Sequence, residues 1–368
     1  MIHIAAPEIG PEEIKAVNKV LESGMLAQGP VVAAFEEAFA AFCGTTYSLA
    51  VNNGTAALHA ALYAAGVGPG DEVITTPFSF IATINPILMV GARPVLVDIE
   101  PETFNIDVSK IEAAVTDKTK AIIPVHLYGQ PVDWDELQAI ADKHGLKLIE
   151  DACQAVGAEY KGKKAGSLGD LACFSLYATK NIMCGEGGVV TTNNEDYAQA
   201  VKHFRQHGMV AQYEYGDIGY NYRLSDLHAA IAVEQLKKAD RFTAARQATA
   251  KKLDEGLKGI KGLISPVTAP DRTHVYHQYT MRVTDEFPMG RDEFVQYLRD
   301  HEVGAGVYYP KGLHQYPHIA KLGYKVGDFP EGEKAGAQVV SLPVHPKVTD
   351  DDVAVMVKVI TEASRGGK

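Results

Sequence analysis

The sequence predicts an α/β protein with two parts: a large domain with a mostly parallel central sheet flanked by helices, and a smaller C-terminal α/β domain. Helical stripes alternate with short apolar runs through the first two thirds of the chain, and one strand–helix–strand unit can be recognised. A length of 368 residues suffices for both domains. We place them at residues 1–245 and 246–368, with the N-terminal segment able to pack on the small domain.

Helices are expected at three places before residue 70. In Pro11–Ser23, the proline suits a first helical turn and Gly24 ends the helix. Residues 32–42 carry bulky apolar side chains at helical spacing and stop at Gly44. Residues 54–65 form a third apolar stripe.

Short runs rich in branched apolar residues are expected to be buried strands. They are Glu72–Thr75 and residues 94–97, 121–125 and 147–149. A helical pattern at residues 133–143 connects the last two runs. Because parallel strands need a crossover of this kind, this unit predicts parallel pairing.

The last third of the chain is expected to begin with a long helix from residue 223 to about residue 256. A strand at 275–283, a helix at 291–301, a short strand at 306–309 and a final helix at Asp350–Ala363 follow. This order predicts the second, smaller α/β unit.

Composition excludes several classes of protein. The net charge of −11 argues against a nucleic-acid partner. The longest apolar region, 73–99, is interrupted by three prolines, so no membrane span is expected. The first eleven residues lack a secretion signal, and the four cysteines show no CxxC pair. We expect a reduced cytoplasmic enzyme without a metal and without membrane contact.

Lys180 is the most informative residue. A Gly-Glu-Gly-Gly turn follows it at 185–188, and Asp151 lies 29 positions earlier, at the end of an expected buried strand. A lysine that forms a Schiff base and an acid that holds a pyridinium nitrogen are the minimum equipment for pyridoxal 5'-phosphate (PLP) chemistry. Taken singly, each has an ordinary alternative: a surface lysine, and a solvated carboxylate at a strand end.

Candidate phosphate ligands occur near two of the expected elements. Gly54 and Thr55 open the third helix, and helix N-termini attract anions. Ser175, five residues before Lys180, can donate its hydroxyl group to the same phosphate. The alternative is an ordinary capped helix start.

Two further segments offer cofactor contacts. Residues 76–80 follow a strand, and Phe80 is the candidate for stacking on a cofactor ring, whereas Phe78 suits a core position. Asn221 lies in a polar segment before the long helix and can reach a phosphate. The alternative there is a helix cap at Ser225.

Together these segments resemble one family across nearly the whole chain. It is the DegT/DnrJ/EryC1/StrS sugar aminotransferases, PLP enzymes of the aspartate aminotransferase fold (PLP-dependent transferase fold type I). The similar segments, in order, are residues 24–30, 53–58, 76–83, 150–158, 174–188, 219–230 and 309–317.

The resemblance implies a role for each matching residue. Lys180 would carry PLP and Asp151 would hold the pyridinium nitrogen, both as catalytic residues, with Gln154 beside the phenolic oxygen. The implied cofactor-binding residues are Gly54, Thr55, Phe80, Asp151, Gln154, Ser175, Lys180 and Asn221. Asn221 would reach the cofactor of a neighbouring subunit, which implies a homodimer with shared active sites.

The implied reaction moves an amino group from glutamate or glutamine to a keto group of a nucleotide-linked deoxy sugar, through a pyridoxamine phosphate form of the cofactor. Lys180, where some relatives have histidine, favours transamination over dehydration. Glu186 resembles members that act at C4 of the sugar. Tyr309 and His314 are the candidate substrate residues.

Other functions remain open within the enzyme class: a keto-cyclitol aminotransferase and a PLP-dependent sugar dehydratase. A non-enzymatic regulator on this fold is disfavoured, because it has no need for Lys180, Asp151 and Ser175 together. A nicotinamide-dependent oxidoreductase is disfavoured because no Gly-x-Gly-x-x-Gly fingerprint follows the first strand.

Overall fold

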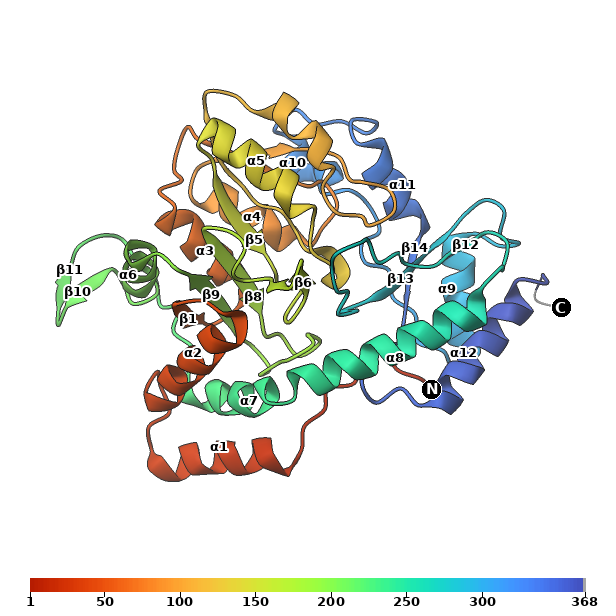
Figure 1. Cartoon of the computed structure of the whole chain (residues 1–368), viewed down its shortest axis with the longest axis horizontal. Coiled ribbons are helices and arrows are strands. Elements are labelled where there is room, and N and C mark those ends of the chain that lie inside the picture. Colours follow the sequence, from red (N-terminus) through yellow and green to blue (C-terminus); the bar gives the residue numbers. More distant parts are fainter. Residues whose placement is uncertain (367–368) are drawn as a thin grey trace.

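The computed structural model describes residues 1–366 and centres on a seven-stranded sheet (Figure 1). In spatial order its strands are β1 (Tyr47–Val51), β9 (Gly188–Thr192), β8 (Leu171–Ser175), β5 (Lys147–Asp151), β4 (Thr119–Ile122), β2 (Glu72–Thr75) and β3 (Arg93–Leu96). Strand β9 runs antiparallel to both neighbours, whereas the other pairs are parallel. The prediction of a mostly parallel sheet is confirmed.

Helices cover both faces of this sheet. On one face, α2 (Pro30–Cys43) and α7 (Asp226–Leu236) share a core with β8, where Phe39 packs edge-on against Phe174 at 5.0 Å between ring centroids. On the other face, α3 (Gly54–Ala64) and α6 (Glu195–Phe204) enclose Leu58 and Cys173. Every residue of β8 is buried, which is typical of a parallel sheet covered on both sides.

The other elements of the large domain are short or peripheral. The helices are α1 (Pro11–Ser23), α4 (Asn85–Met89) and α5 (Trp134–His144), with 3₁₀ turns η1 (Ile81–Thr83), η2 (Val108–Lys110), η3 (Glu112–Ala114) and η4 (Leu127–Gly129). The strands are β6 (Glu159–Tyr160), β7 (Lys163–Lys164), β10 (Met209–Ala211) and β11 (Glu214–Tyr215). Helix α1 and strand β2 have the predicted bounds.

The long helix expected at 223–256 is two helices, so that prediction is wrong in this detail. Helix α7 ends at Leu236, and α8 begins at Ala239 and runs to Leu257. At the break, the amine of Lys238 lies 2.7 Å from the carboxylate of Glu13 in α1. The break therefore coincides with an anchor for α1, a contact between segments more than 220 residues apart.

The smaller unit is a three-stranded antiparallel sheet of β12 (Leu263–Ile264), β13 (Tyr279–Val283) and β14 (Val339–Leu342), covered by α8 (Ala239–Leu257), α9 (Arg291–Asp300) and α12 (Asp350–Ala363). Turn η5 (Leu313–Gln315) and helices α10 (Pro317–Ala320) and α11 (Pro330–Gln338) lie between β13 and β14 in the sequence but pack against the large domain, where Leu313 and Ile319 share a core with Ile84 and Leu96. Figure 1 shows α8 extending from the large sheet into this unit, so the predicted division at residue 245 lies within a continuous helix.

Two strand predictions in this region need correction. The strand expected at 275–283 begins only at Tyr279, and residues 306–309 form no strand; Gly306 makes a single bridge with Ser341. The final helix has the predicted bounds. At the N-terminus, Ile2 bridges Val303, so the start of the chain packs on the small unit.

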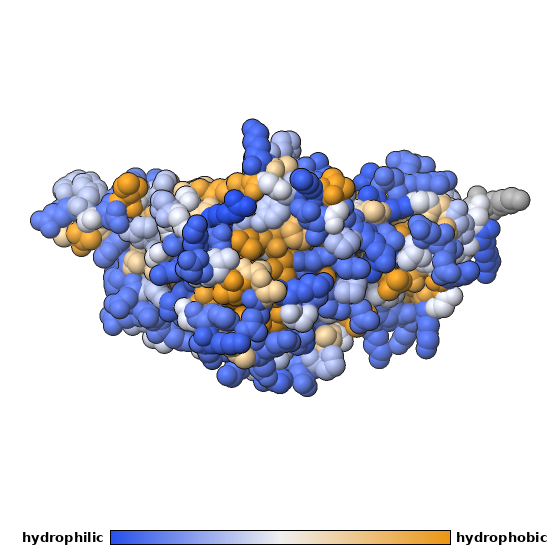
Figure 2. Space-filling view, turned by 90° about the horizontal axis from the view of Figure 1, so that it is seen from above, coloured by the Kyte–Doolittle hydropathy of each residue, from blue (hydrophilic) through white to orange (hydrophobic). Residues whose placement is uncertain are grey.

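A two-stranded arm of β10 and β11 projects from the large domain, at the left of Figure 1. Exposed apolar and aromatic side chains cluster on and beside it: Val210, Tyr213, Tyr215 and Ile218. Figure 2 shows hydrophobic residues at this end of the molecule and along the middle of the same face. No helix within residues 1–366 combines the length and apolar character required to cross a bilayer.

Candidate active site

Three strand ends meet at one edge of the large sheet. Ser175 at the end of β8 pairs with Gly188 at the start of β9, and Gly188 pairs in turn with Val51 at the end of β1. Asp151 ends the neighbouring strand β5 and pairs with Cys173. Because the carboxyl ends of β1, β8 and β5 lie side by side, the polar segments that follow them converge, as at ligand sites of open α/β sheets.

These segments line a cavity of about 460 Å³, a size typical of small-molecule sites. The cavity brings together most of the residues expected from the sequence: Gly54, Thr55, Phe80, Asp151, Gln154, Ser175, Lys180 and Tyr309. Glu186 also lines it. Residues more than 250 positions apart in the sequence are therefore neighbours in one hollow.

Two of the expected residues lie outside this cavity. Asn221 is exposed on the surface, where its carbonyl oxygen lies 3.5 Å from the side-chain amide of Asn52. His314 is fully buried where turn η5 packs on the large domain, with its Nε2 2.9 Å from Glu333 Oε1 and its ring edge-on to Phe329. The geometry gives His314 no contact with the cavity, and its role in substrate binding stays a prediction.

Lys180 lines the cavity from a tight turn formed by residues 177–185, which we call the Lys180 segment. The Ala178 amide donates to the Gly185 carbonyl at 3.0 Å, and the Lys180 amide donates to the Tyr177 carbonyl at 2.8 Å. Burial lowers the pKa of the Lys180 amine, because desolvation of the ammonium outweighs its attraction to Cys153 and Asp151. A lysine with a lowered pKa is a better nucleophile at neutral pH.

The lowered pKa predicts how the protein captures PLP. Only the neutral amine attacks an aldehyde, so the rate of PLP attachment to the cofactor-free protein should rise with pH and level off below the ordinary lysine value of 10.5. Stopped-flow absorbance across a pH series measures this midpoint. A midpoint at or above the ordinary value would show that burial does not control the reactivity of Lys180.

Asp151 is a buried carboxylate with two fixed partners. Its Oδ2 accepts a hydrogen bond from the Thr83 hydroxyl at 2.7 Å, and its Oδ1 accepts one from the Cys153 amide at 3.2 Å. The Thr83 hydroxyl also lies 2.8 Å from that of Ser79. Such bonds fix the orientation of the carboxylate at the cavity wall. Sequence reasoning did not identify Thr83, which lies 68 residues from Asp151.

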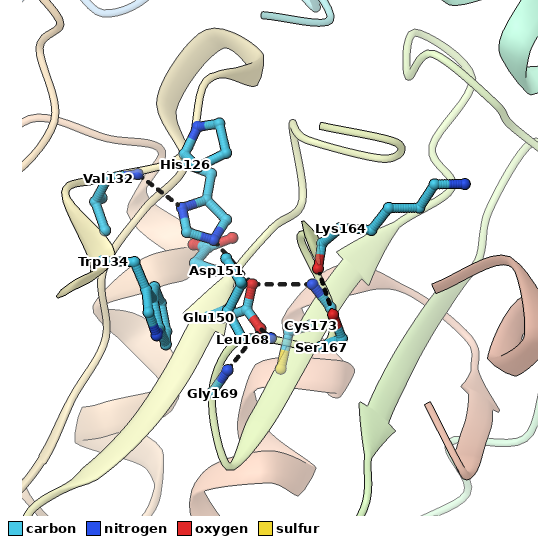
Figure 3. A network of polar contacts seen from close by, with 12 residues as sticks. His126, Val132, Trp134, Glu150, Asp151, Lys164, Ser167, Leu168, Gly169 and Cys173 are labelled. Carbon is cyan, nitrogen blue, oxygen red and sulfur yellow. Dashed lines mark hydrogen bonds and ion pairs between the residues drawn. The ribbon is translucent and has the colours of Figure 1, made fainter. Parts of the chain in front are cut away.

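A second buried carboxylate, Glu150, fixes the strand end behind Asp151 (Figure 3). It accepts hydrogen bonds from the backbone amides of Gly166 at 2.9 Å, Leu168 at 2.9 Å and Gly169 at 3.0 Å. His126 Nε2 lies 3.0 Å from it, while His126 Nδ1 accepts from the Val132 amide, so Nε2 carries the donated proton. The His126 amide donates to the Asp151 carbonyl at 3.1 Å. The network thereby fixes the backbone that carries Asp151.

Gln154 is held between two aromatic residues. Its Oε1 accepts a hydrogen bond from the Tyr128 amide at 2.9 Å, and its Nε2 donates to the Tyr309 hydroxyl at 3.2 Å. Burial raises the pKa of the Tyr309 phenol, so Tyr309 is neutral and keeps its proton. Gln154 thus links the backbone of Tyr128, in the large domain, to the side chain of Tyr309.

Aromatic rings form the outer wall of the cavity. Phe80 is 55% exposed and lies 6.0 Å from Tyr309 between ring centroids, whereas Phe78 is fully buried in the core. An exposed ring at the edge of a cavity is available to stack on a planar ligand. Phe78 thus occupies the core position expected for it, whereas stacking of Phe80 on a cofactor ring stays a prediction.

The N-terminus of α3 forms a cradle too narrow for a side chain. A Cβ atom on Gly54 would lie 2.9 Å from Ser175 Cβ and 3.0 Å from Cys153 Sγ. The side chain of Asn53 caps the helix by accepting from the Ala56 amide at 2.8 Å. The backbone at the start of α3 therefore packs closely on the Ser175 side chain, and the free amides of a helix N-terminus suit an anion.

Replacing Gly54 with alanine should close this cradle. We expect PLP affinity to fall at least about tenfold and the protein to be destabilised by about 1–3 kcal/mol, because backbone or packed atoms must move. PLP titration and thermal unfolding measure the two effects. Gly68→Ala is the matched control, since a Cβ there meets nothing within 4 Å. Equal effects at both positions would contradict the steric argument.

The donor set suits PLP. Lys180 supplies the amine, the buried carboxylate of Asp151 suits a pyridinium nitrogen, and Phe80 suits the ring face. Gly54 and Ser175 form a narrow anion cradle at a helix N-terminus.

Comparison with known proteins supports the assignment of a PLP site. A model of the DegT/DnrJ/EryC1/StrS aminotransferase family matches residues 7–361. The chain is 40% identical over 357 residues to GDP-perosamine synthase of Caulobacter vibrioides, covering 96% of this chain and 95% of the relative. It is 39% identical over 346 residues to UDP-2-acetamido-2-deoxy-3-oxo-D-glucuronate aminotransferase of Pseudomonas aeruginosa, with 94% of each covered.

Solved structures give the same result for the fold. DesV of S. venezuelae has a TM-score of 0.92 at 36% identity, over 96% of this chain and 94% of that one. The expected α/β fold, cofactor and enzyme class are thereby confirmed. The chain belongs to the DegT/DnrJ/EryC1/StrS aminotransferase family and is a PLP-dependent aminotransferase.

Proposed function

We propose that this enzyme transfers an amino group from glutamate or glutamine to the keto group of a nucleotide-linked deoxy sugar, at C4. The observation that carries the proposal is that the Lys180 amine and the Asp151 carboxylate share one cavity with the helix N-terminus at Gly54. The two curated relatives named above are a GDP-sugar and a UDP-sugar enzyme by name, which supports a nucleotide-linked acceptor.

Support for C4 is the resemblance of Glu186, which lines the cavity, to family members that act at C4. The name of the Pseudomonas relative specifies a 3-oxo sugar, at an identity close to that of the perosamine enzyme. The proposal of C4 therefore rests on the resemblance of Glu186 to members that act at that carbon.

Different residues of the cavity have different roles in the proposed reaction. Bound PLP supplies an electron sink for the amino donor's α-carbon. The neutral amine of Lys180 is the base that removes the proton from this carbon, and its lowered pKa suits that role. The Asp151 carboxylate, fixed by Thr83 and Cys153, would hold a proton on the ring nitrogen of bound PLP. Gln154 donates to the Tyr309 hydroxyl, and the Tyr309 ring lies 6.0 Å from that of Phe80, so these three residues form one wall of the cavity.

A screen of donors and acceptors tests the proposed reaction. Glutamate and glutamine are each combined with nucleotide-linked 3-keto and 4-keto sugars, and products are read by mass. The expected result is an amino sugar from the 4-keto substrate, with one keto acid formed per amine transferred. Loss of water without keto-acid formation would instead identify a dehydratase, and amination of a keto-cyclitol alone would move the acceptor outside the sugar nucleotides.

We also propose a homodimer in which Asn221 contacts the partner's cofactor phosphate. Asn221 is exposed and lies outside its own cavity. The nearby arm carries Val210, Tyr213 and Ile218 exposed to solvent, an apolar surface of the kind that protein interfaces bury. A cytoplasmic location stays a prediction.

Mixing inactive variants tests the shared site. Lys180→Ala and Asn221→Ala chains are each expected to be weakly active or inactive, but their heterodimer contains one site with both native residues and should recover up to half the activity per site. The matched control is a mixture of Lys180→Ala and Asp151→Asn chains, whose residues lie in the same cavity and cannot complement. No recovery after proven chain exchange would contradict the role of Asn221.

A further inference from the structure

Helix α11 is capped by a carboxylate from a distant part of the chain. Its first residue, Pro330, has no amide proton, so its first free amides belong to Glu331 and Gly332. Asp98, shortly after strand β3, accepts hydrogen bonds from both: Oδ2 lies 3.0 Å from the Glu331 nitrogen and Oδ1 lies 2.9 Å from the Gly332 nitrogen. Asp98 is buried, and Phe329, at the usual capping position, makes no side-chain cap. Asp98 therefore supplies the cap from 233 residues away.

Two glycines let α11 pack closely on its neighbours. An added Cβ atom on Gly332 would lie 3.3 Å from Asp98 Oδ1, on the side of the large domain. One turn later, Gly336 faces residues 308–316, which we call the wall segment. An added Cβ on Gly336 would lie 2.9 Å from Lys311 Cα, so the helix rests directly on the backbone of this segment. Because residues four apart share a helix face, one face of α11 connects Asp98 with the wall segment.

The wall segment is also tied to the large domain directly. The Leu313 amide donates to the Pro77 carbonyl at 2.6 Å. Phe78, the next residue, shares a buried cluster with Ala335 of α11. Tyr309 packs on this cluster, with its ring edge-on to Phe78 at 6.3 Å between centroids. The wall segment therefore rests on the large domain, although it follows the first strands of the small unit in the sequence.

Tyr309 is the residue that these contacts bring to the active site. It lines the main cavity, and its hydroxyl accepts a hydrogen bond from Gln154 Nε2 at 3.2 Å. Asp98 lies outside the cavity and does not touch a ligand bound there. Its route to the reaction is through α11 and the wall segment.

We propose that Asp98 is a positioning residue for amino transfer: its cap on α11 holds the wall segment so that Tyr309 stays at the cavity wall. Without the carboxylate, two amides at the start of α11 lose their partner, which destabilises the first turn of the helix. The contact between Gly336 and the wall segment then loosens, and Tyr309 moves away from Gln154. Asp98 thereby affects substrate binding and leaves the chemical step to Lys180.

A cap that only stabilises the fold is the alternative, and Asn194 provides the matched control for it. The Asn194 side chain also accepts from two amides of a first helical turn, those of Asp196 and Tyr197 in α6, at 2.8 and 3.2 Å. It belongs to the large domain and lies outside the cavity. Asn194→Ala therefore removes two cap bonds without touching α11 or the wall segment.

Amide hydrogen exchange of the cofactor-free enzyme is the first test, because it needs neither PLP nor substrate. In Asp98→Ala we expect the amides of the wall segment to exchange at least about tenfold faster than in the wild type, since local opening becomes easier. Asn194→Ala should speed exchange at the start of α6 and leave the wall segment unchanged. Wild-type exchange of the wall segment in Asp98→Ala would overturn the proposal.

Steady-state kinetics are the second test, and this one rests on the proposed nucleotide-sugar acceptor. Asp98→Ala should raise the KM for the 4-keto substrate about tenfold and change kcat less than about threefold, the equivalent of one lost hydrogen bond in binding. Equal changes in Asp98→Ala and Asn194→Ala would contradict a positioning role. If the wild type aminates no sugar nucleotide, the proposed function fails, and hydrogen exchange still decides the role of Asp98.

A double-mutant cycle with Tyr309→Ala shows whether Asp98 acts through Tyr309. When Tyr309 is already absent, Asp98→Ala should raise the acceptor KM less than about twofold further, because two changes that act through one contact are not additive. The full tenfold effect in that background would show a different route and sink the proposal. Asp98→Asn keeps the size of the side chain and replaces Asp98→Ala if that variant does not fold; smaller changes in the same direction are expected.

Discussion

Replacing Lys180 with alanine should reduce amino transfer by at least about four orders of magnitude. The substitution removes the amine that carries the cofactor and the base that moves the donor's α-proton, so two functions are lost at once. The measurement is single-turnover formation of keto acid from glutamate. A parallel measurement is borohydride reduction of the PLP-loaded protein, followed by mass analysis of the labelled peptide, which should contain Lys180 in the wild type and be absent in the variant.

A surface lysine provides the control for this result. Lys163 lies exposed in the short strand β7, away from the cavity. Lys163→Ala should therefore retain wild-type turnover and labelling. The assignment would be wrong if Lys180→Ala kept measurable turnover, or if borohydride fixed the cofactor to another peptide.

The parts of the fold that the sequence predicts best are those with local signals. Helix α1 begins at a proline and ends at Gly24, and its observed bounds match the prediction. Helix α12 begins after Thr349, whose hydroxyl accepts from the Asp352 amide, and it also matches. Such caps depend on residues three or four positions apart, so a single sequence contains the whole interaction.

The errors occur where a distant contact decides the structure. The break between α7 and α8 has no proline or glycine; it coincides with the pairing of Lys238 and Glu13, far apart in the sequence. Strand β8 is buried on both faces and shows no alternation of polar and apolar residues. The antiparallel direction of β9 likewise depends on its pairing with β1 and β8, which no local pattern reveals.

In the site, too, residues with a local sequence signal were predicted, and residues brought in by distant contacts were not. Lys180, Asp151, Ser175 and Gly54 belong to segments that follow sheet strands, and their convergence follows from the parallel topology. The residues that support them were not identified in advance: Thr83, Tyr128, His126 and His277 contact the site from other loops. Each is an ordinary residue type without a motif, and only its position in space gives it a function.

Replacing Asp151 with asparagine should lower turnover by about 10²–10⁴-fold while PLP still attaches to Lys180. The amide has the size of the carboxylate but no charge, so it cannot hold a proton on the ring nitrogen, and the cofactor's electron sink is weakened. It also presents an NH₂ group to either Thr83 or Cys153, both of which now donate to Asp151. The expected signature is normal labelling of Lys180 with slow formation of keto acid.

Thr83→Val separates the charge of Asp151 from its orientation. This variant keeps the carboxylate and the volume near it but removes the 2.7 Å hydrogen bond. The expected loss is about tenfold, the equivalent of a single hydrogen bond to a charged group. Turnover and PLP affinity are measured for both variants. If Thr83→Val reduced turnover as strongly as Asp151→Asn, the position of the carboxylate would matter more than its charge, and Asp151 would then be a residue that positions the ring without sustaining the proton on it.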